Sequence, residues 1–182
     1  MRQLLLIAVL FCAEVNAQVF LTEHGNAVFL SKAPLNEFEG KSASLKGLID
    51  FEKNLIDFYL DLNTLKTGIS LRDKHMRDNY LETKKFPFAE FSGKIQNLSE
   101  IDLNDLRNGK KVIAEGNFSI HGVSMPRLIE GTLSLDEKDQ VLKLNCTFNV
   151  LLTDHNISKP SIMGYDLADV QQVSITATFQ KQ

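Results

Sequence analysis

A period-two alternation of apolar and polar residues is the feature that most limits how this chain can fold. It is clearest in three segments, 56–63, 142–152 and 173–180. In the second, the apolar positions are Leu142, Leu144, Cys146, Phe148, Val150 and Leu152. Successive side chains of a β-strand point to opposite faces, so each segment predicts a strand with one apolar face and one solvated face.

Six further segments alternate more weakly, and they are 19–24, 27–32, 43–51, 86–95, 111–121 and 127–135. Turn-forming residues separate several of the segments: His24-Gly25-Asn26, Glu52-Lys53-Asn54, Arg107-Asn108-Gly109 and the run 136–139. Half-solvated strands at hairpin spacing are typical of an antiparallel sheet. The sequence therefore predicts an all-β fold of about nine strands, closed into a barrel or stacked as a sandwich.

Four glycines stand where the apolar face of a strand would carry a bulky side chain: Gly47, Gly93, Gly116 and Gly131. Glycine permits the sharp coiling of a barrel, and it also leaves space inside one. Both interpretations stay open.

One segment, 70–81, breaks the strand pattern and predicts a short helix. Ser70 is placed to cap its first turn, and Asp73 follows three residues later, close to a capping box. A weaker helical turn is predicted over 99–106. The helix over 70–81 could plug or flank one end of a barrel.

The first 17 residues have the features of a secretory signal peptide. Arg2 precedes an apolar run, 4–11, and Val15-Asn16-Ala17 offers small residues for cleavage before Gln18. The run is shorter than the roughly 20 residues of a membrane-spanning helix, which argues against stable membrane insertion. Phe11 before Cys12 argues against a lipoprotein. We therefore expect an exported domain over 18–182.

The composition argues against two classes of function. The formal charge of the chain is −3, with acids and bases intermixed, so no basic face predicts nucleic-acid binding. Cys146 stands in an alternating strand, and we interpret it as a small buried hydrophobe. The histidines lack metal-site spacing. Asp154-His155 could suggest a general base, but the chain has no nucleophilic serine in a G-x-S-x-G motif. No enzyme, metal or cofactor is predicted.

The helical segment and two later stretches carry a distinctive set of motifs. They are Thr67-Gly68-Ile69, the run 72–77, Tyr80-Leu81, Phe86-Pro87, Phe91-Ser92-Gly93, the run 116–123 and the run 154–157. In this order, from about Gly40 to Phe179, the chain strongly resembles the YceI-like polyisoprenoid-binding family. The pair Asn117 and Phe118 departs from the family pattern and leaves the exact ligand open.

The resemblance implies an extended, lipocalin-like antiparallel barrel of about eight strands with one short helix and an apolar tunnel. It also implies a carrier of an isoprenoid lipid or quinone, exported to the bacterial periplasm, that requires no cofactor and could form a homodimer. The residues expected to line the tunnel are Phe58, Leu60, Leu144, Phe148, Val150, Ile175 and Phe179. Without the resemblance, the same residues would favour a filled core and a structural or interaction module.

The polar motif residues have two interpretations. Arg72, Asp73, His75, Arg77, His121 and His155 either lie at the tunnel mouth, where they would meet a polar headgroup, or hold the end of the barrel together. The second interpretation is favoured, because helix caps and arginine–carboxylate pairs are commonly structural. A third alternative, an enzyme acting on a lipid, would require the histidines to cluster with carboxylates in the cavity.

Overall fold

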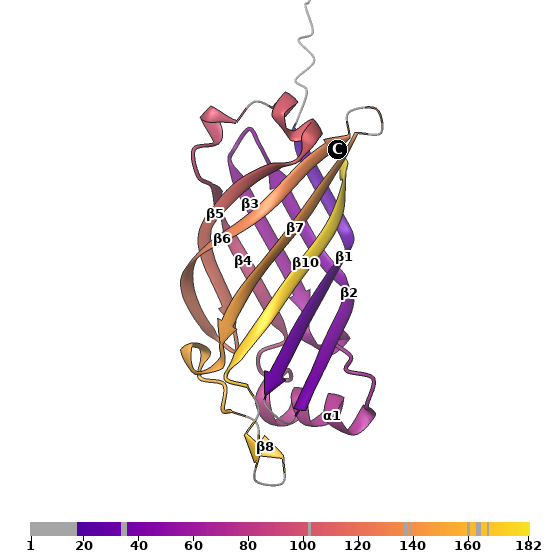
Figure 1. Cartoon of the computed structure of the whole chain (residues 1–182), viewed down its shortest axis with the longest axis vertical. Coiled ribbons are helices and arrows are strands. Elements are labelled where there is room, and N and C mark those ends of the chain that lie inside the picture. The colour runs from indigo at the N-terminus through magenta and orange to yellow at the C-terminus, as the bar shows by residue number, and fades with distance from the viewer. Residues whose placement is uncertain are drawn as a thin grey trace, which may run out of the picture.

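The chain folds into a closed barrel of eight antiparallel strands (Figure 1). The computed structural model describes residues 18–182 except 34, 35, 102, 137, 139, 160, 163, 164 and 167. Around the barrel the strand order is β1-β10-β7-β6-β5-β4-β3-β2. The strands are β1 Val19–Ala33, β2 Asn36–Asp50, β3 Leu55–Asp61, β4 Phe88–Ile95, β5 Lys110–Ile120, β6 Val123–Asp136, β7 Val141–Leu151 and β10 Val170–Lys181. The predicted all-β barrel is confirmed.

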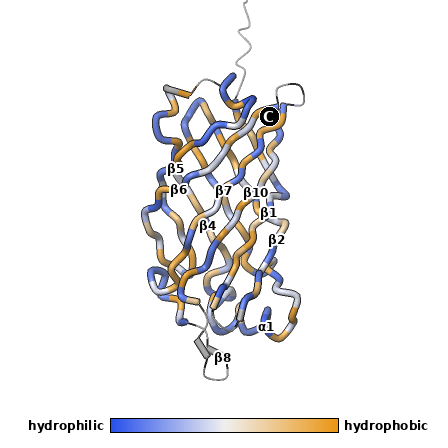
Figure 2. Tube along the Cα trace, viewed as in Figure 1, coloured by the Kyte–Doolittle hydropathy of each residue, from blue (hydrophilic) through white to orange (hydrophobic). Residues whose placement is uncertain are grey.

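The inward and outward faces follow the period-two pattern. On β3, Ile56 and Leu60 are buried while Asp57 and Tyr59 are exposed. Hydrophobic and hydrophilic positions alternate along the strands in Figure 2. Because every second side chain enters the barrel, the alternation fixes which residues can reach its interior.

The first strand corrects the predicted strand count. The turn expected at His24-Gly25-Asn26 is wrong: β1 runs through it as a single strand, and its register with β2 shifts on both sides of Gly25. A Cβ at Gly25 would lie 3.1 Å from the Cβ of Ala177, so the glycine lets β1 approach β10 closely at this bulge. The two segments predicted on either side of the turn are therefore one strand, which reduces nine strands to eight.

The predicted helix over 70–81 is present as an α-helix, α1 Ser70–His75, followed by a π-helical turn, η2 Met76–Tyr80. Ser70 is not its cap, which corrects the prediction, because Ile69 occupies the N-cap position and makes no side-chain bond there. Instead, the carboxylate of Asp73 accepts hydrogen bonds from the backbone N–H of Thr67, at 2.7 Å, and from its hydroxyl. The helix is thus tied to the loop before it.

Short helical turns lie at both ends of the barrel. The predicted turn near 99–106 consists of two 3₁₀ turns, η3 Leu98–Glu100 and η4 Leu103–Asn108. Figure 1 shows the barrel end that holds α1 opposite the C-terminus. The remaining elements are η1 Leu62–Thr64, η5 Leu152–His155 and a small two-stranded sheet of β8 Ser161–Ile162 and β9 Tyr165–Asp166.

One cluster of completely buried apolar side chains lies at the end away from α1. Leu106 of η4, Leu142 of β7 and Phe179 of β10 have no exposed surface, and Phe20 of β1 is 3% exposed. Phe20 also packs edge-on against Phe51, with ring centroids 5.8 Å apart. We call this the closed end. Within the described residues, no helix has both the length and the apolarity to cross a bilayer.

Candidate functional site

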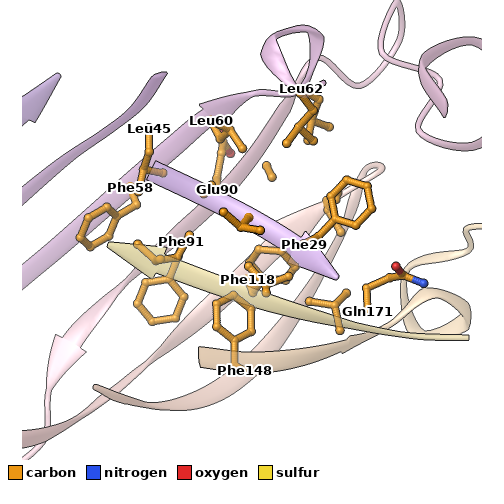
Figure 3. Close-up of a pocket in the computed structure, with 18 of the residues that line it drawn as sticks. Phe29, Leu45, Phe58, Leu60, Leu62, Glu90, Phe91, Phe118, Phe148 and Gln171 are labelled. Atoms are coloured by element: carbon orange, nitrogen blue, oxygen red, sulfur yellow. The ribbon is translucent and has the colours of Figure 1, made fainter. Parts of the chain in front are cut away.

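An elongated apolar cavity of about 540 Å³ occupies the barrel between the closed end and α1. All eight barrel strands contribute to its lining. In Figure 3, labelled side chains that include Phe29, Phe118 and Phe148 point toward a common space. Its volume falls within the range of about 300 to 1,000 Å³ that is typical of small-molecule sites.

The inward-facing residues show where the filled core ends and the cavity begins. On β7, Leu142 is completely buried, whereas Leu144, Cys146 and Phe148 remain half-buried although they face the interior. On β10, Phe179 is completely buried and Ile175 is half-buried. A solid interior would leave none of these side chains accessible, so the alternative of a completely filled barrel does not hold.

The cavity reaches the surface beside α1. Ile69 and Leu71 line it and are also 53% and 62% exposed, and Arg72 and His75 line it at the same place. We call these four residues the mouth. At the opposite end the packed side chains of the closed end form a floor.

Most of the predicted tunnel residues do line the cavity: Phe58, Leu60, Leu144, Phe148, Val150 and Ile175. Phe179 lies among the packed side chains of the closed end, with its ring edge-on against Phe58 at a centroid distance of 5.8 Å. Phe179 is therefore part of the packed floor and does not line the cavity. The lining also includes Phe29, Leu45, Phe91 and Phe118, which were not predicted, although Phe91 and Phe118 stand inside the motifs that carried the resemblance.

The four glycines divide between the two predicted roles. Gly93 and Gly116 are directly paired across β4 and β5, and a Cβ on Gly116 would lie 2.7 Å from the Cα of Gly93. A Cβ on Gly47 would overlap the ring of Phe58. These three permit close packing, whereas Gly131 lines the cavity.

Arg72 and Asp73 take different positions at the mouth. The guanidinium of Arg72 stacks on the ring of Phe38, 4.3 Å from its centroid, and donates to the carbonyl of Thr67 at 2.8 Å. Its buried Nε has no partner among the described residues. Burial alone would raise the pKa of Asp73, but the hydrogen bonds from Thr67 and the charges of Lys66 and Arg77 together outweigh it and lower that pKa. Asp73, which is 6% exposed, is a structural anion outside the cavity lining.

Two of the three motif histidines, His121 and His155, hold the turns at the α1 end of the barrel, beside the mouth. His155, which has no exposed surface, donates through Nδ1 to the carbonyl of Val123 at 3.1 Å, and burial lowers its pKa. His121 contacts the carboxylate of Glu82 through Nε2 at 2.8 Å and the carbonyl of His155 through Nδ1 at 3.1 Å. Neither histidine lines the cavity, and nor does Arg77. His121 and His155 join the β5–β6 turn to η5 and to Glu82, which follows η2.

Chemically reactive groups are few in the cavity. Cys146 lines it, and burial raises the pKa of its thiol to about 11, which keeps it protonated and weakly nucleophilic at ordinary pH. Across the described part of the chain, no three His, Cys, Asp or Glu side chains are grouped to hold a metal ion. The lining is mostly apolar, and its polar side chains are Ser31, Arg72, His75, Tyr80, Glu90 and Gln171.

Comparisons with known proteins agree with this geometry. A family model described as the YceI-like domain matches residues 19–180. UPF0312 protein plu2095 of Photorhabdus laumondii is 27% identical over 88 residues, which cover 48% of this chain and 41% of that protein. The chain thus matches less than half the length of this relative.

Solved structures share the fold. A polyisoprenoid binding domain from Saccharophagus degradans, implicated in plant cell wall breakdown, superposes with a TM-score of 0.74 at 15% identity, covering 91% of this chain and 99% of that domain. BcnA of Burkholderia cenocepacia superposes with a TM-score of 0.65 at 12% identity, covering 85% and 95%. At such identities the likeness concerns the fold.

Proposed function

The chain belongs to the YceI-like domain family, and from that premise we propose that it binds a long apolar ligand inside its barrel without altering it chemically. The ligand we infer is an isoprenoid lipid or the isoprenoid tail of a quinone. The polyisoprenoid binding domain that shares its fold supports this choice.

The observation that carries the proposal is the half-burial of inward-facing side chains in the middle of the barrel, above a solid floor. Apolar surface left in water costs about 25 cal/mol per Å². A preformed cavity can take that surface out of water with little ordering of the protein. A chain-shaped ligand needs no dense set of polar partners, and this cavity provides few.

In this proposal the tail contacts Phe58, Leu60, Leu144, Phe148, Val150 and Ile175 above the floor that Phe179 supports. A polar headgroup would lie near Arg72 and His75. Asp73, His121 and His155 hold the scaffold around the mouth, and Arg77 lies outside the cavity lining. The protonated thiol of Cys146 and the structural bonds of both histidines support a non-enzymatic role.

We further propose that the protein acts in the bacterial envelope. Residues 1–17, which carry the predicted signal peptide, lie outside the described residues. The barrel begins at Val19, directly after the predicted cleavage site, so removal of the leader would leave every strand intact. The homodimer stays a prediction, and the mass of the native protein would test it.

The test is native mass spectrometry of the protein purified from its own compartment, followed by organic extraction. We expect a mature chain that begins at Gln18 and carries an apolar lipid. Ala114→Phe, which places a ring in the cavity, should reduce the bound lipid about tenfold. Its neighbour Ile113 faces outward and is 37% exposed, so Ile113→Phe is the matched control. Folded wild-type protein without lipid, or equal lipid in both variants, would contradict the proposal.

A further inference from the structure

The mouth exposes apolar side chains that are continuous with the cavity. Ile69 and Leu71 are among the most exposed large hydrophobic residues of the described chain, and both belong to the cavity lining. Lys74 and His75 follow Leu71 by three and four residues on α1 and are exposed, so they lie beside it on the same helical face. An apolar path therefore leads from the barrel interior to a rim with cationic neighbours.

The segment that forms this rim is basic, although the chain as a whole is acidic. Residues 66–85, which we call the mouth segment, contain six Lys or Arg and three Asp or Glu, a formal charge of +3. The whole chain has 20 and 23, a charge of −3, so the remainder carries −6. The exposed cations of the segment are Lys66, Lys74, Lys84 and Lys85.

Acidic side chains close to the mouth are largely engaged within the protein. Asp73 is buried against Thr67, and Glu82 contacts His121. On the neighbouring hairpin of β1 and β2, Lys32 pairs with Glu37 and Lys41 with Glu39, so these four charges cancel. The exposed acids of the segment are Asp78 and Glu82, and Glu82 is the one that contacts His121. The four exposed lysines therefore outnumber the two exposed acids of the mouth segment, which leaves its surface with an excess of positive charge.

We propose that the mouth docks on an anionic lipid bilayer, with Ile69 and Leu71 entering the interface and the lysines of the mouth segment meeting the headgroups. Apolar side chains flanked by lysines are the combination that holds proteins at such surfaces. Docking would place the cavity opening against the bilayer, so an apolar ligand could pass between them without crossing water. That purpose rests on the proposed function, whereas docking itself can be measured without any ligand.

The electrostatic part is tested by cosedimentation of residues 18–182, which contain every strand, with phosphatidylglycerol-containing vesicles and with pure phosphatidylcholine vesicles. Binding should require the anionic lipid and weaken with salt. Lys74→Glu with Lys85→Glu should lower partitioning by more than about tenfold. The control changes Lys111 and Lys143, exposed on the barrel wall, to Glu and alters the net charge equally. Similar losses from both pairs, or no preference for anionic vesicles, would overturn the proposal.

The apolar part is tested at constant charge. Leu71→Ser should reduce vesicle binding by about fivefold or more, because it removes a side chain from the interface. Leu128, which is 64% exposed on β6, provides the control Leu128→Ser, which should bind as the wild type does. Equal binding by all three proteins would contradict docking through the mouth. So would a wild-type dimer that Leu71→Ser converts to monomers while vesicles bind neither form, since a second copy would then cover the rim.

A soluble fluorescent probe with an apolar tail separates docking from the proposed function. The variant with glutamate at positions 74 and 85 should bind the probe from solution normally, because neither lysine lines the cavity. It should accept the same probe from anionic vesicles more slowly than the wild type does. A protein that binds vesicles but never the probe would refute the proposed function and leave docking intact. A protein that binds the probe but not the vesicles would refute docking and leave the proposed function intact.

Discussion

The two ends of this barrel are built from the same strands but differ in packing. At the closed end, Leu106, Leu142 and Phe179 have no exposed surface. At the open end, Ile69 and Leu71 are mostly exposed, and the buried Nε of Arg72 lacks a partner among the described residues. Both ends contain buried apolar side chains, since Leu62 and Ile157 near α1 are 1% and 2% exposed, but the open end also leaves apolar surface and hydrogen-bonding capacity unused.

This difference indicates that one end contributes mainly to stability and the other remains available for a ligand. Stabilisation from burial concentrates where the side chains touch one another, because dispersion and the removal of surface from water both require contact. The half-buried side chains around the cavity contribute less to stability and remain available to a ligand. A variant at each end should therefore affect a different property.

The largest expected effect comes from truncating matched aromatic residues in the two halves. Phe179→Ala leaves a hole in the packed floor and should lower the free energy of unfolding by about 3–5 kcal/mol. Phe148→Ala enlarges an existing cavity and should cost less than about 2 kcal/mol. Urea denaturation measures both. Equal losses would mean that the two halves are packed alike, against this comparison.

A smaller effect is expected from adding a methyl group to glycines of the barrel wall. Gly116→Ala forces a Cβ to within 2.7 Å of the Cα of Gly93, so backbone must move, and we expect a loss of about 2–3 kcal/mol. At Gly131 the nearest atoms would lie at 3.2 Å and the cavity is adjacent. Gly131→Ala should therefore cost less than about 1 kcal/mol in thermal denaturation. A larger loss of stability for Gly131→Ala than for Gly116→Ala would show that the wall is packed more tightly beside the cavity.

The smallest expected effect is a pH dependence that arises at the open end. Burial holds the pKa of His155 below 6.5, so the unfolded chain binds the proton more readily than the folded protein does. The free energy of unfolding should therefore fall as the pH drops through 6.5. His155→Gln should flatten this slope, whereas the exposed His24→Gln should not. Parallel slopes in the wild type and the His155 variant would contradict the assignment.

The sequence predicted the barrel well because period two is visible along much of its strands, most clearly in β3, β7 and β10. It mispredicted the turn at His24-Gly25-Asn26, because a bulge and a turn draw on the same residue types. Ser70 likewise has the composition of a cap, but the nearby Asp73 and Thr67 form the local bonds instead.

The cavity was the harder part to predict. Phe148 and Phe179 are the same residue type, and both face inward on neighbouring strands, yet one lines a void and the other a filled floor. Whether an inward-facing side chain lines the cavity or belongs to the floor depends on its position along the barrel axis and on the element that covers that end of the barrel. Leu106 of η4 covers the closed end, and the apolar–polar alternation of the strands does not predict that this residue packs there.

The most direct test of the central claim is a crystal structure of the protein soaked with an alkyl chain that carries a terminal bromine. We predict an anomalous bromine signal inside the barrel, beside Phe118 and Phe148, whose ring centroids lie 5.6 Å apart. A bromine found only on the outer wall, with the interior filled by protein side chains, would contradict the account.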